Sequence, residues 1–308
     1  MPPLLKVADR VRAAVAEGRA VVALESTIIA HGLPRSRNLQ AAHDFESMLT
    51  DVGVTPATIA VIDGVPTVGL DDDELERIAV EHMPKVSSRD LAVAVGRKAS
   101  GATTIAATST LAELAGIRVF ATGGLGGVHR AASEPFDESA DLVTLSRTRV
   151  TVVCAGVKSI LDIAATLERL ESLNVPVVGY HTSKFPAFYL ADSGFPLDWR
   201  VDSAEEVAAI MAAGDELGER NAVIVANPVP LHQQLDPDVH DRLVIQAMQA
   251  ADDAGLRGKA VSLFMVDYFE RESGGRSLQV NLDLTTNNVT VAGEIALAWA
   301  ERGSQPPL

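Results

Sequence analysis

Short apolar runs rich in valine and isoleucine alternate along most of the chain with longer amphipathic stretches. Continuous runs of this kind are typical of strands that are covered on both faces. Six such runs are predicted strands: residues 21–24, 58–62, 118–121, 151–155, 176–180 and 222–226. Five stretches carry apolar residues at helical spacing: residues 39–49, 71–81, 160–173, 204–217 and 239–254. The alternation predicts an α/β fold in which helices cover both faces of one sheet.

Three further patterns refine this picture. Two apolar runs flank Asp63-Gly64, a strong hairpin signal, so the sheet should be mixed rather than purely parallel. From Asp236 onward the pattern is mainly helical, and residues 185–200 read as an irregular loop. Neither an internal repeat nor a long polar linker interrupts the sequence, which predicts a single domain over residues 1–308.

Composition limits the classes of function. The chain has 41 acidic and 26 basic side chains and a formal charge of −15, which argues against a nucleic-acid polymer as partner. A small anionic metabolite is still compatible with this charge, because a few local cations can dominate a pocket. Cys154 is the single cysteine, charged residues interrupt the first twenty positions, and no run reaches the ~18 apolar residues of a membrane span. We therefore expect a cytoplasmic protein without disulfides or a cysteine-based metal site.

Glu25 interrupts an otherwise apolar predicted strand. A carboxylate at such a position is costly unless it is paired or protonated. A raised pKa would suit this side chain to general-acid catalysis. The alternative is an ordinary glutamate at a strand end that meets a surface cation.

Lys158 follows a buried strand and Gly156, and Ser159 with Asp162 has the spacing of a capping box. This spacing predicts that Lys158 lies at a helix N-terminus. The helix dipole and apolar neighbours would both disfavour the protonated amine. A second cation such as Lys85 would act in the same direction, as at Schiff-base lysines. A lysine that stays protonated and binds phosphate is the alternative, and the local sequence does not separate the two.

Ser87 with Asp90 has the spacing of a second capping box, so a helix should begin near Ser88, and Lys85 and Arg89 flank this helix start. The free N–H groups of a helix start favour an anion, and phosphate is the natural ligand beside two cations. A solvated helix cap with two surface cations explains the same spacing equally well.

Two more segments are candidates for binding. Residues 122–130 hold four glycines, whose N–H groups could receive an oxygen anion, although many such loops are plain turns. His129 in this loop is either a base, a hydrogen-bond donor or a structural residue.

If the next segment is extended, Asp137, Ser139 and Asp141 share one face and could hold a hard divalent ion mostly through water. A bare acidic turn is the alternative.

Motifs that follow one another through nearly the whole chain connect these candidate sites. They are Ala23-Leu-Glu-Ser-Thr-Ile-Ile-Ala-His-Gly32, Lys85 with Ser87 and Arg89-Asp-Leu91, Gly101-Ala-Thr-Thr-Ile-Ala-Ala-Thr108, Gly116-Ile-Arg-Val-Phe-Ala-Thr-Gly-Gly124, Gly126-Gly-Val-His-Arg130, Asp137, Ser139-Ala-Asp-Leu142, Val153-Cys-Ala-Gly-Val-Lys-Ser-Ile-Leu-Asp-Ile163, Phe185-Pro-Ala-Phe-Tyr189, Ser277-Leu278, Asn281 and Asn287-Asn288. In this set and order, the chain resembles the pseudouridine-5′-phosphate glycosidase family, also called indigoidine synthase A-like.

The resemblance implies a three-layer α/β/α fold with a mixed central sheet, and a homotrimer. It also implies reversible cleavage of pseudouridine 5′-phosphate to uracil and ribose 5-phosphate in pseudouridine catabolism, through a lysine Schiff base with ring-opened ribose. Lys158 would be the nucleophile and Glu25 the proton donor. Substrate-binding roles would fall to Lys85, Ile105, His129, Ser139, Ala140, Asp141 and Asn281.

By the same resemblance, Asp137 would bind one divalent ion per subunit, Mn2+ in the family. Glu138 departs from the family pattern, which has isoleucine at this position. Strand alternation predicts that the added carboxylate points away from the metal.

Two rival functions keep part of this constellation. A class I aldolase-like lyase on another sugar phosphate would use the Lys158 Schiff base, but aldol cleavage needs no acid such as Glu25 aimed at a ring oxygen. A non-catalytic sugar-phosphate-binding protein would retain Lys85 and form no imine.

Overall fold

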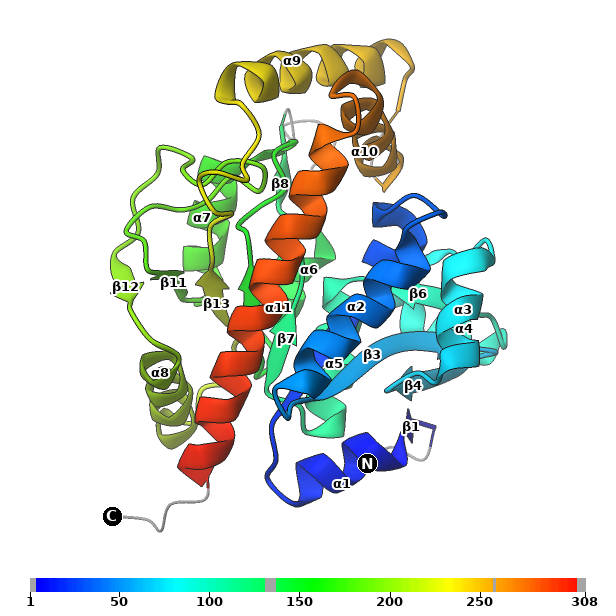
Figure 1. Cartoon of the computed structure of the whole chain (residues 1–308), viewed down its shortest axis with the longest axis vertical. Coiled ribbons are helices and arrows are strands. Elements are labelled where there is room, and N and C mark those ends of the chain that lie inside the picture. The colour runs from blue at the N-terminus through cyan, green and yellow to red at the C-terminus, as the bar shows by residue number, and fades with distance from the viewer. Residues whose placement is uncertain (1–3, 131–136, 257–258, 304–308) are drawn as a thin grey trace.

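A mixed sheet forms the centre of the computed structural model, which describes residues 4–130, 137–256 and 259–303 (Figure 1). Within these residues the sheet has 11 strands, nine of them in the order β1-β4-β3-β2-β7-β9-β13-β11-β12, with β6 joined to β3 and β5 joined to β6. A separate pair, β8 and β10, lies beside it. The strand bounds are β1 Lys6–Val7, β2 Val21–Glu25, β3 Thr55–Ile62, β4 Val65–Val68, β5 Lys85–Val86, β6 Gly101–Thr103, β7 Val119–Ala121, β8 Val128–His129, β9 Thr151–Cys154, β10 Leu161–Asp162, β11 Val177–Tyr180, β12 Trp199–Val201 and β13 Val223–Ala226.

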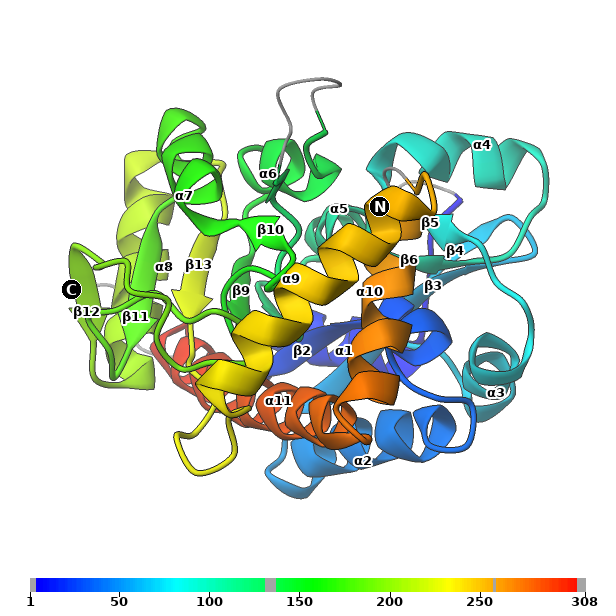
Figure 2. The ribbon, with the colours of Figure 1, turned by 90° about the horizontal axis from the view of Figure 1, so that it is seen from above.

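Helices cover both faces of this sheet, which makes the three predicted layers (Figures 1 and 2). One face packs against α1, α5, α6 and α7, and the other against α2, α8 and α11. The two cores divide the side chains of β2 by strand alternation: Val21 and Ala23 enter the first, Val22 and Leu24 the second. The helix bounds are α1 Asp9–Ala16, α2 Asn38–Asp51, α3 Asp72–Val80, α4 Leu91–Gly96, α5 Ile105–Ala115, α6 Ala140–Leu145, α7 Ile163–Ser172, α8 Ala204–Leu217, α9 Pro237–Asp253, α10 Lys259–Glu272 and α11 Arg276–Gly303.

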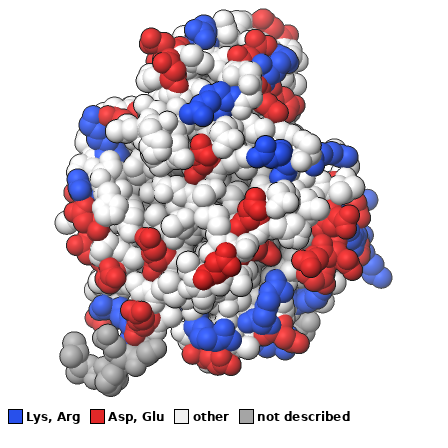
Figure 3. Space-filling view, viewed as in Figure 1, with Lys and Arg blue, Asp and Glu red and all other residues white. Residues whose placement is uncertain are grey.

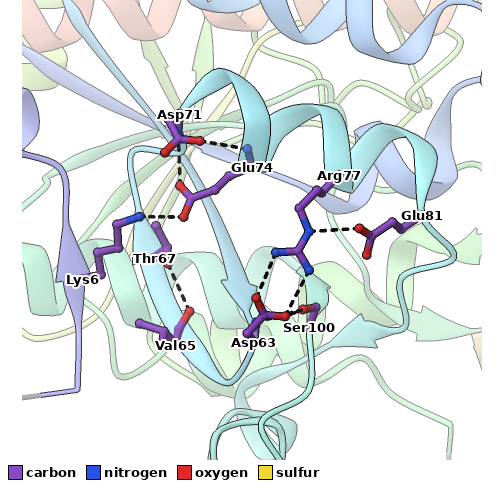
Figure 4. A network of polar contacts seen from close by, with 9 residues as sticks. All are labelled: Lys6, Asp63, Val65, Thr67, Asp71, Glu74, Arg77, Glu81 and Ser100. Atoms are coloured by element: carbon purple, nitrogen blue, oxygen red, sulfur yellow. Dashed lines mark hydrogen bonds and ion pairs between the residues drawn. The ribbon is translucent and has the colours of Figure 1, made fainter.

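The predicted hairpin is confirmed and makes the sheet mixed. Strands β3 and β4 pair antiparallel, with Ile62 opposite Val65, whereas β2, β7, β9 and β13 are parallel neighbours. Asp63 and Gly64 between them both have positive φ, 51° and 79°. Polar contacts then tie the turn to α3, because Arg77 donates to both Asp63 carboxylate oxygens at 3.0 Å (Figure 4).

The predicted helix start at Ser159 is wrong. Ser159 donates its hydroxyl to the Ala187 carbonyl at 2.8 Å, and β10 (Leu161–Asp162) pairs with β8 before the helix begins. Helix α7 (Ile163–Ser172) instead has Asp162 as its N-cap, accepting from the Ala165 N–H at 3.0 Å. A long-range strand pairing therefore overrides the local capping signal.

The described residues beyond Asp236 are mainly helical, as predicted, and form α9, α10 and α11. Helix α11 crosses one face of the sheet beside α2 (Figure 1). The predicted loop 185–200 ends two residues early, since β12 begins at Trp199. Among the described residues, none of these helices is both long and apolar enough to cross a membrane.

Candidate functional site

The candidate site lies where parallel strands end at one edge of the sheet. Glu25 is the last residue of β2, Thr122 directly follows β7, and Lys158 comes shortly after β9. The pairing of Leu24 with Ala121 sets Glu25 and Thr122 side by side. Ligand sites of α/β sheets form at this edge, because the carboxyl ends of parallel strands and their following loops converge there.

Glu25 is a buried carboxyl group, 7% exposed, whose Oε1 accepts a hydrogen bond from the Thr122 hydroxyl. Burial raises the pKa of Glu25, and Lys158, the Thr122 hydrogen bond and Lys85 each lower it by smaller amounts; Asp141 raises it further. The net direction is upward, so the site favours the protonated acid. A surface pairing of this glutamate, the other interpretation of the sequence, does not describe the structure.

Lys158 is half-buried in the loop between β9 and β10. Its backbone is fixed on both sides, since its N–H donates to the Leu125 carbonyl at 3.1 Å and its carbonyl accepts from Leu161 at 2.9 Å. Helix α7 begins only at Ile163, so the predicted place of Lys158 at a helix N-terminus is wrong. What brings this lysine to Glu25 is the parallel sheet and not a helix cap.

Two cavities meet at these groups, and Glu25, Lys85 and Lys158 line both. The first, the apolar cavity, is walled by aromatic and aliphatic side chains including Ile160, Phe188, Tyr189, Met265 and Phe269. The second, the polar cavity, is lined mainly by polar and charged side chains, among them Ser87, Arg89, His129, Asp137, Ser139 and Asp141. The arrangement suits a ligand with one flat, weakly polar part and one anionic part.

All ten residues predicted to form the site lie on the walls of these two cavities. Ile105, His129, Asp137, Ser139, Ala140 and Asp141 line the polar cavity, and Asn281 lines the apolar one. Glu25, Lys85 and Lys158 lie at their junction. The helix predicted near Ser88 is present as a short 3₁₀ turn, Ser88–Asp90, with the capping box between Ser87 and Asp90.

The sequence suggested that Asp137, Ser139 and Asp141 share one face of an extended segment. In the structure Asp141 does not lie on such a face. Ser139 is the N-cap of α6, and Asp141 lies in that helix's first turn. The Asp141 carboxylate accepts from the N–H groups of Ala106 at 3.0 Å and of Gly126 at 3.1 Å. A Cβ on Gly126 would lie 2.3 Å from the Ser139 hydroxyl, so a glycine is required for this approach. The glycine-rich loop thus gives the Gly126 N–H to Asp141 rather than to an outside anion.

Asp137 lies in the polar cavity with His129 as its neighbour, 3.8 Å between Oδ2 and Nδ1. Glu138 forms an ion pair with Arg169 at 3.0 Å, so its carboxylate is already engaged by a cation. In the described part of the chain, no group of three or more His, Cys, Asp or Glu side chains is placed to hold a metal. These residues fit a hydrated ion held by one carboxylate and do not fit a cage made by the protein alone.

The sequence did not single out two residues at the site. His31 lies in the apolar cavity, and burial, with the charge of Lys85, lowers its pKa to about 4, so this imidazole is neutral. Thr122 was noted only as part of a glycine-rich loop. Its contact with Glu25 follows from the pairing of β2 with β7, which the local sequence does not reveal.

Comparisons with known proteins show the family to which the chain belongs. The family described as "Indigoidine synthase A like protein" matches residues 10–298. A pseudouridine-5′-phosphate glycosidase of Frankia alni is 58% identical over 97% of this chain and 83% of its own length. One from Saccharopolyspora erythraea is 56% identical over 96% of this chain and 97% of its own.

Solved structures show the same fold. The prealnumycin C-glycosynthase AlnA, determined in complex with ribulose 5-phosphate, superposes with a TM-score of 0.91 at 36% identity and covers 99% of both chains. An indigoidine synthase A-like protein from Thermotoga maritima gives a TM-score of 0.88 at 33% identity, over 97% of this chain and 98% of its own. Fold, site and sequence thus lead to one assignment: the chain belongs to the indigoidine synthase A-like family.

Proposed function

We propose that this enzyme cleaves the C–C glycosidic bond of pseudouridine 5′-phosphate reversibly, giving uracil and ribose 5-phosphate. The observation that carries the proposal is the buried Glu25 at the junction of two cavities, with Lys158 and Lys85 on the same walls. The matched relatives named pseudouridine-5′-phosphate glycosidase support the same substrate. The neighbour solved with ribulose 5-phosphate supports a pentose phosphate as part of the ligand.

The substrate explains why the reaction needs both an amine and an acid. Uracil is bonded to the sugar through carbon, so protonation of a heteroatom cannot alone make it leave. In the first step the Lys158 amine attacks C1′ of the ribose, and the bond from C1′ to the ring oxygen breaks. Glu25 gives its proton to that oxygen, which becomes the free hydroxyl of the opened sugar. The environment that favours a protonated Glu25 supports this role.

The second step breaks the carbon–carbon bond. The attack leaves the Lys158 nitrogen positively charged, and it first returns a proton to the Glu25 carboxylate and so regains its lone pair. That lone pair forms a C=N bond, the electrons of the glycosidic bond pass to the uracil carbon, and that carbon takes up one proton in exchange. A Schiff base with ring-opened ribose 5-phosphate remains on the lysine. Water hydrolyses the imine, so the sum is one substrate plus one water giving uracil and ribose 5-phosphate.

We assign the two parts of the substrate to the two cavities. The flat uracil suits the apolar cavity, whose polar groups include Asn281. The phosphoribosyl part suits the polar cavity, where Lys85, the start of α5 at Ile105, and His129 offer a cation and hydrogen-bond donors. Residues Ser139, Ala140 and Asp141 line the same wall and would contact the sugar phosphate.

A divalent ion, Mn2+ by resemblance, would be held by Asp137 and otherwise by water. Such an ion supplies positive charge beside a bound phosphate. The partial exposure of this carboxylate, 34% of the side chain, leaves room for the water ligands. Chelation should then lower activity and added Mn2+ should restore it, whereas Asp137→Asn should not respond to the metal.

The direct test is uracil release from pseudouridine 5′-phosphate, followed by chromatography. We expect release by the unmodified enzyme, no turnover by Lys158→Ala, and retained substrate binding by that variant in calorimetry. Absence of uracil release by the intact enzyme, with or without Mn2+, would refute the proposed function. An aldolase-like lyase would fail this assay but cleave another sugar phosphate, and it would not depend on Glu25.

A further inference from the structure

Four buried polar residues are connected by hydrogen bonds in a series that ends on Glu25, with the link from Asn288 made to the backbone of Thr122. They are Asn227 after β13, Asn288 in α11, Thr122 after β7, and Glu25 at the end of β2. Asn227 donates to Asn288 Oδ1 at 3.0 Å, and Asn288 Nδ2 donates to the carbonyls of Thr122 at 2.7 Å and Gly123 at 3.2 Å. The Thr122 hydroxyl then donates to Glu25 Oε1.

The Asn288 side chain is fully buried, and both its nitrogen and its oxygen have partners. Its nitrogen donates to the carbonyls of Thr122 and Gly123, and its oxygen accepts from Asn227. An apolar side chain of the same size would fill this place without the cost of desolvating an amide. A buried polar network with every member satisfied fixes one arrangement of the backbone around it. The arrangement fixed here is that of Thr122 and Gly123.

The backbone of Thr122 is also held by the sheet. Its N–H donates to Val153 at 3.0 Å, and the Gly123 carbonyl accepts from Ala155 at 2.9 Å as well as from Asn288. These bonds leave little freedom to the position of the Thr122 side chain. Its hydroxyl is therefore a preset donor for Glu25 and not one that rearranges as the carboxyl changes its charge.

We propose that Asn288, supported by Asn227, is a positioning residue that holds the Thr122 hydroxyl against the acid Glu25. The inference rests on the proposed function, because it describes how the proton donor of that reaction is oriented. With Oε1 occupied by the threonine, the proton of the neutral acid belongs on Oε2 and is available for the substrate's ring oxygen. Neither asparagine touches Glu25 through a hydrogen bond, so both act through Thr122.

The same contact affects the protonation of Glu25. Lys158, Lys85 and Asp141 are the charged groups that face it, the first two favouring its ionised form and the third opposing it. The Thr122 hydrogen bond also favours the ionised form. Removal of the Thr122 hydrogen bond should therefore keep Glu25 protonated to higher pH. Because the reaction needs the protonated acid, the basic limb of the pH profile of kcat, where kcat falls as pH rises, should move to higher pH.

The test compares Thr122→Val, Thr122→Ser, Asn288→Leu and the Thr122→Val/Asn288→Leu double variant in uracil release from pseudouridine 5′-phosphate. We expect Thr122→Val to lower kcat by about tenfold with little change in KM, as for one lost hydrogen bond. Its basic limb should move up by about one pH unit, and Thr122→Ser should retain the original limb. Asn288→Leu should move the limb in the same direction, and the double variant should move it no further than Thr122→Val.

Thr148→Val is the matched control, because Thr148 is also buried and its hydroxyl donates to the Thr144 carbonyl at 3.0 Å, away from Glu25. If Asn288→Leu does not fold, Asn227→Ala tests the same link, because it removes the hydrogen bond that the Asn288 amide oxygen accepts. An unmoved limb in Thr122→Val, or additive effects in the double variant, would overturn the inference. Failure of the intact enzyme to release uracil would instead refute the proposed function, and the two outcomes are therefore distinguishable.

Discussion

At the scale of single residues, the local sequence predicts that Glu25 has an unusual protonation state but does not predict which residues contact it. A carboxyl group in an apolar strand is costly wherever the strand is buried, so the local sequence predicts its unusual state. The partners that modify this state come from residues 60 to 133 positions away, namely Lys85, Thr122 and Lys158. Their approach depends on strand order, which no local pattern encodes.

Replacement of Glu25 by glutamine should separate activity from stability. Burial raises the pKa of Glu25 above the ordinary glutamate value of 4.5, so above pH 4.5 the folded protein retains a proton that the unfolded chain releases. Stability contributed by this group is thus lost as pH rises through the folded pKa. Glu25→Gln should lower kcat by about 10²- to 10⁴-fold. The stability that this variant gains over the original chain, measured as the free energy of unfolding, should be larger at pH 8 than at pH 5.

The measurement is denaturant unfolding at both pH values, together with uracil release. Glu46→Gln is the control, since burial also raises the pKa of Glu46, which accepts from Thr58 and does not line either cavity of the site. It should show the same pH-dependent gain in stability and keep its activity. An equal gain for Glu25→Gln at both pH values would contradict the account of its buried state.

At the scale of elements, the hairpin signal, which depends on backbone conformation, predicted its turn correctly. Of the two capping-box signals, which depend on side chains, the one at Ser87 is confirmed and the one at Ser159 is wrong. The Asp63-Gly64 turn is confirmed because only a few residue types accept positive φ at two consecutive positions. The Ser159–Asp162 capping box does not form, because the Ser159 hydroxyl donates to the carbonyl of Ala187, which is distant in the sequence. A capping serine has several possible acceptors, and tertiary structure decides among them.

The hairpin turn leaves no room for a side chain at Gly64, so a methyl group added there should destabilise the protein. A Cβ at Gly64 would lie 2.5 Å from Lys98 Cα, and the φ of 79° is already unfavourable for other residues. Gly64→Ala should therefore lower the free energy of unfolding by about 1–3 kcal/mol. Gly96→Ala, where a Cβ meets nothing within 4 Å, should be close to neutral in the same urea titration. Equal stability of the two variants would show that the turn is not under this constraint.

At the scale of the whole molecule, the parallel strands explain why the motifs lie far apart in the sequence and together in space. Strands β2, β7 and β9 end at one edge, which brings Glu25, Thr122 and Lys158 to the same cavities. The alternation of strands and helices predicted the layers, but not which strands are neighbours. The face in Figure 3 carries intermixed acidic and basic groups near its rim, with acidic groups scattered over a largely uncharged centre. This face is unlike the basic surfaces that bind nucleic-acid backbones.

The resemblance also predicts a homotrimer, which mass photometry can check. The mass of one chain is 32.5 kDa, so the expected species has three times this mass. A species of one chain mass across the measured concentrations would contradict that prediction and leave the chemistry of the site unaffected.

The central claim is that the Lys158 amine bonds covalently to the sugar, and borohydride reduction in the presence of ribose 5-phosphate tests it most directly. The account predicts one reduced pentose-phosphate adduct, located on Lys158 by peptide mass spectrometry and absent from Lys158→Ala. An enzyme that releases uracil while no adduct is trapped, or that carries the adduct on Lys85, would contradict it.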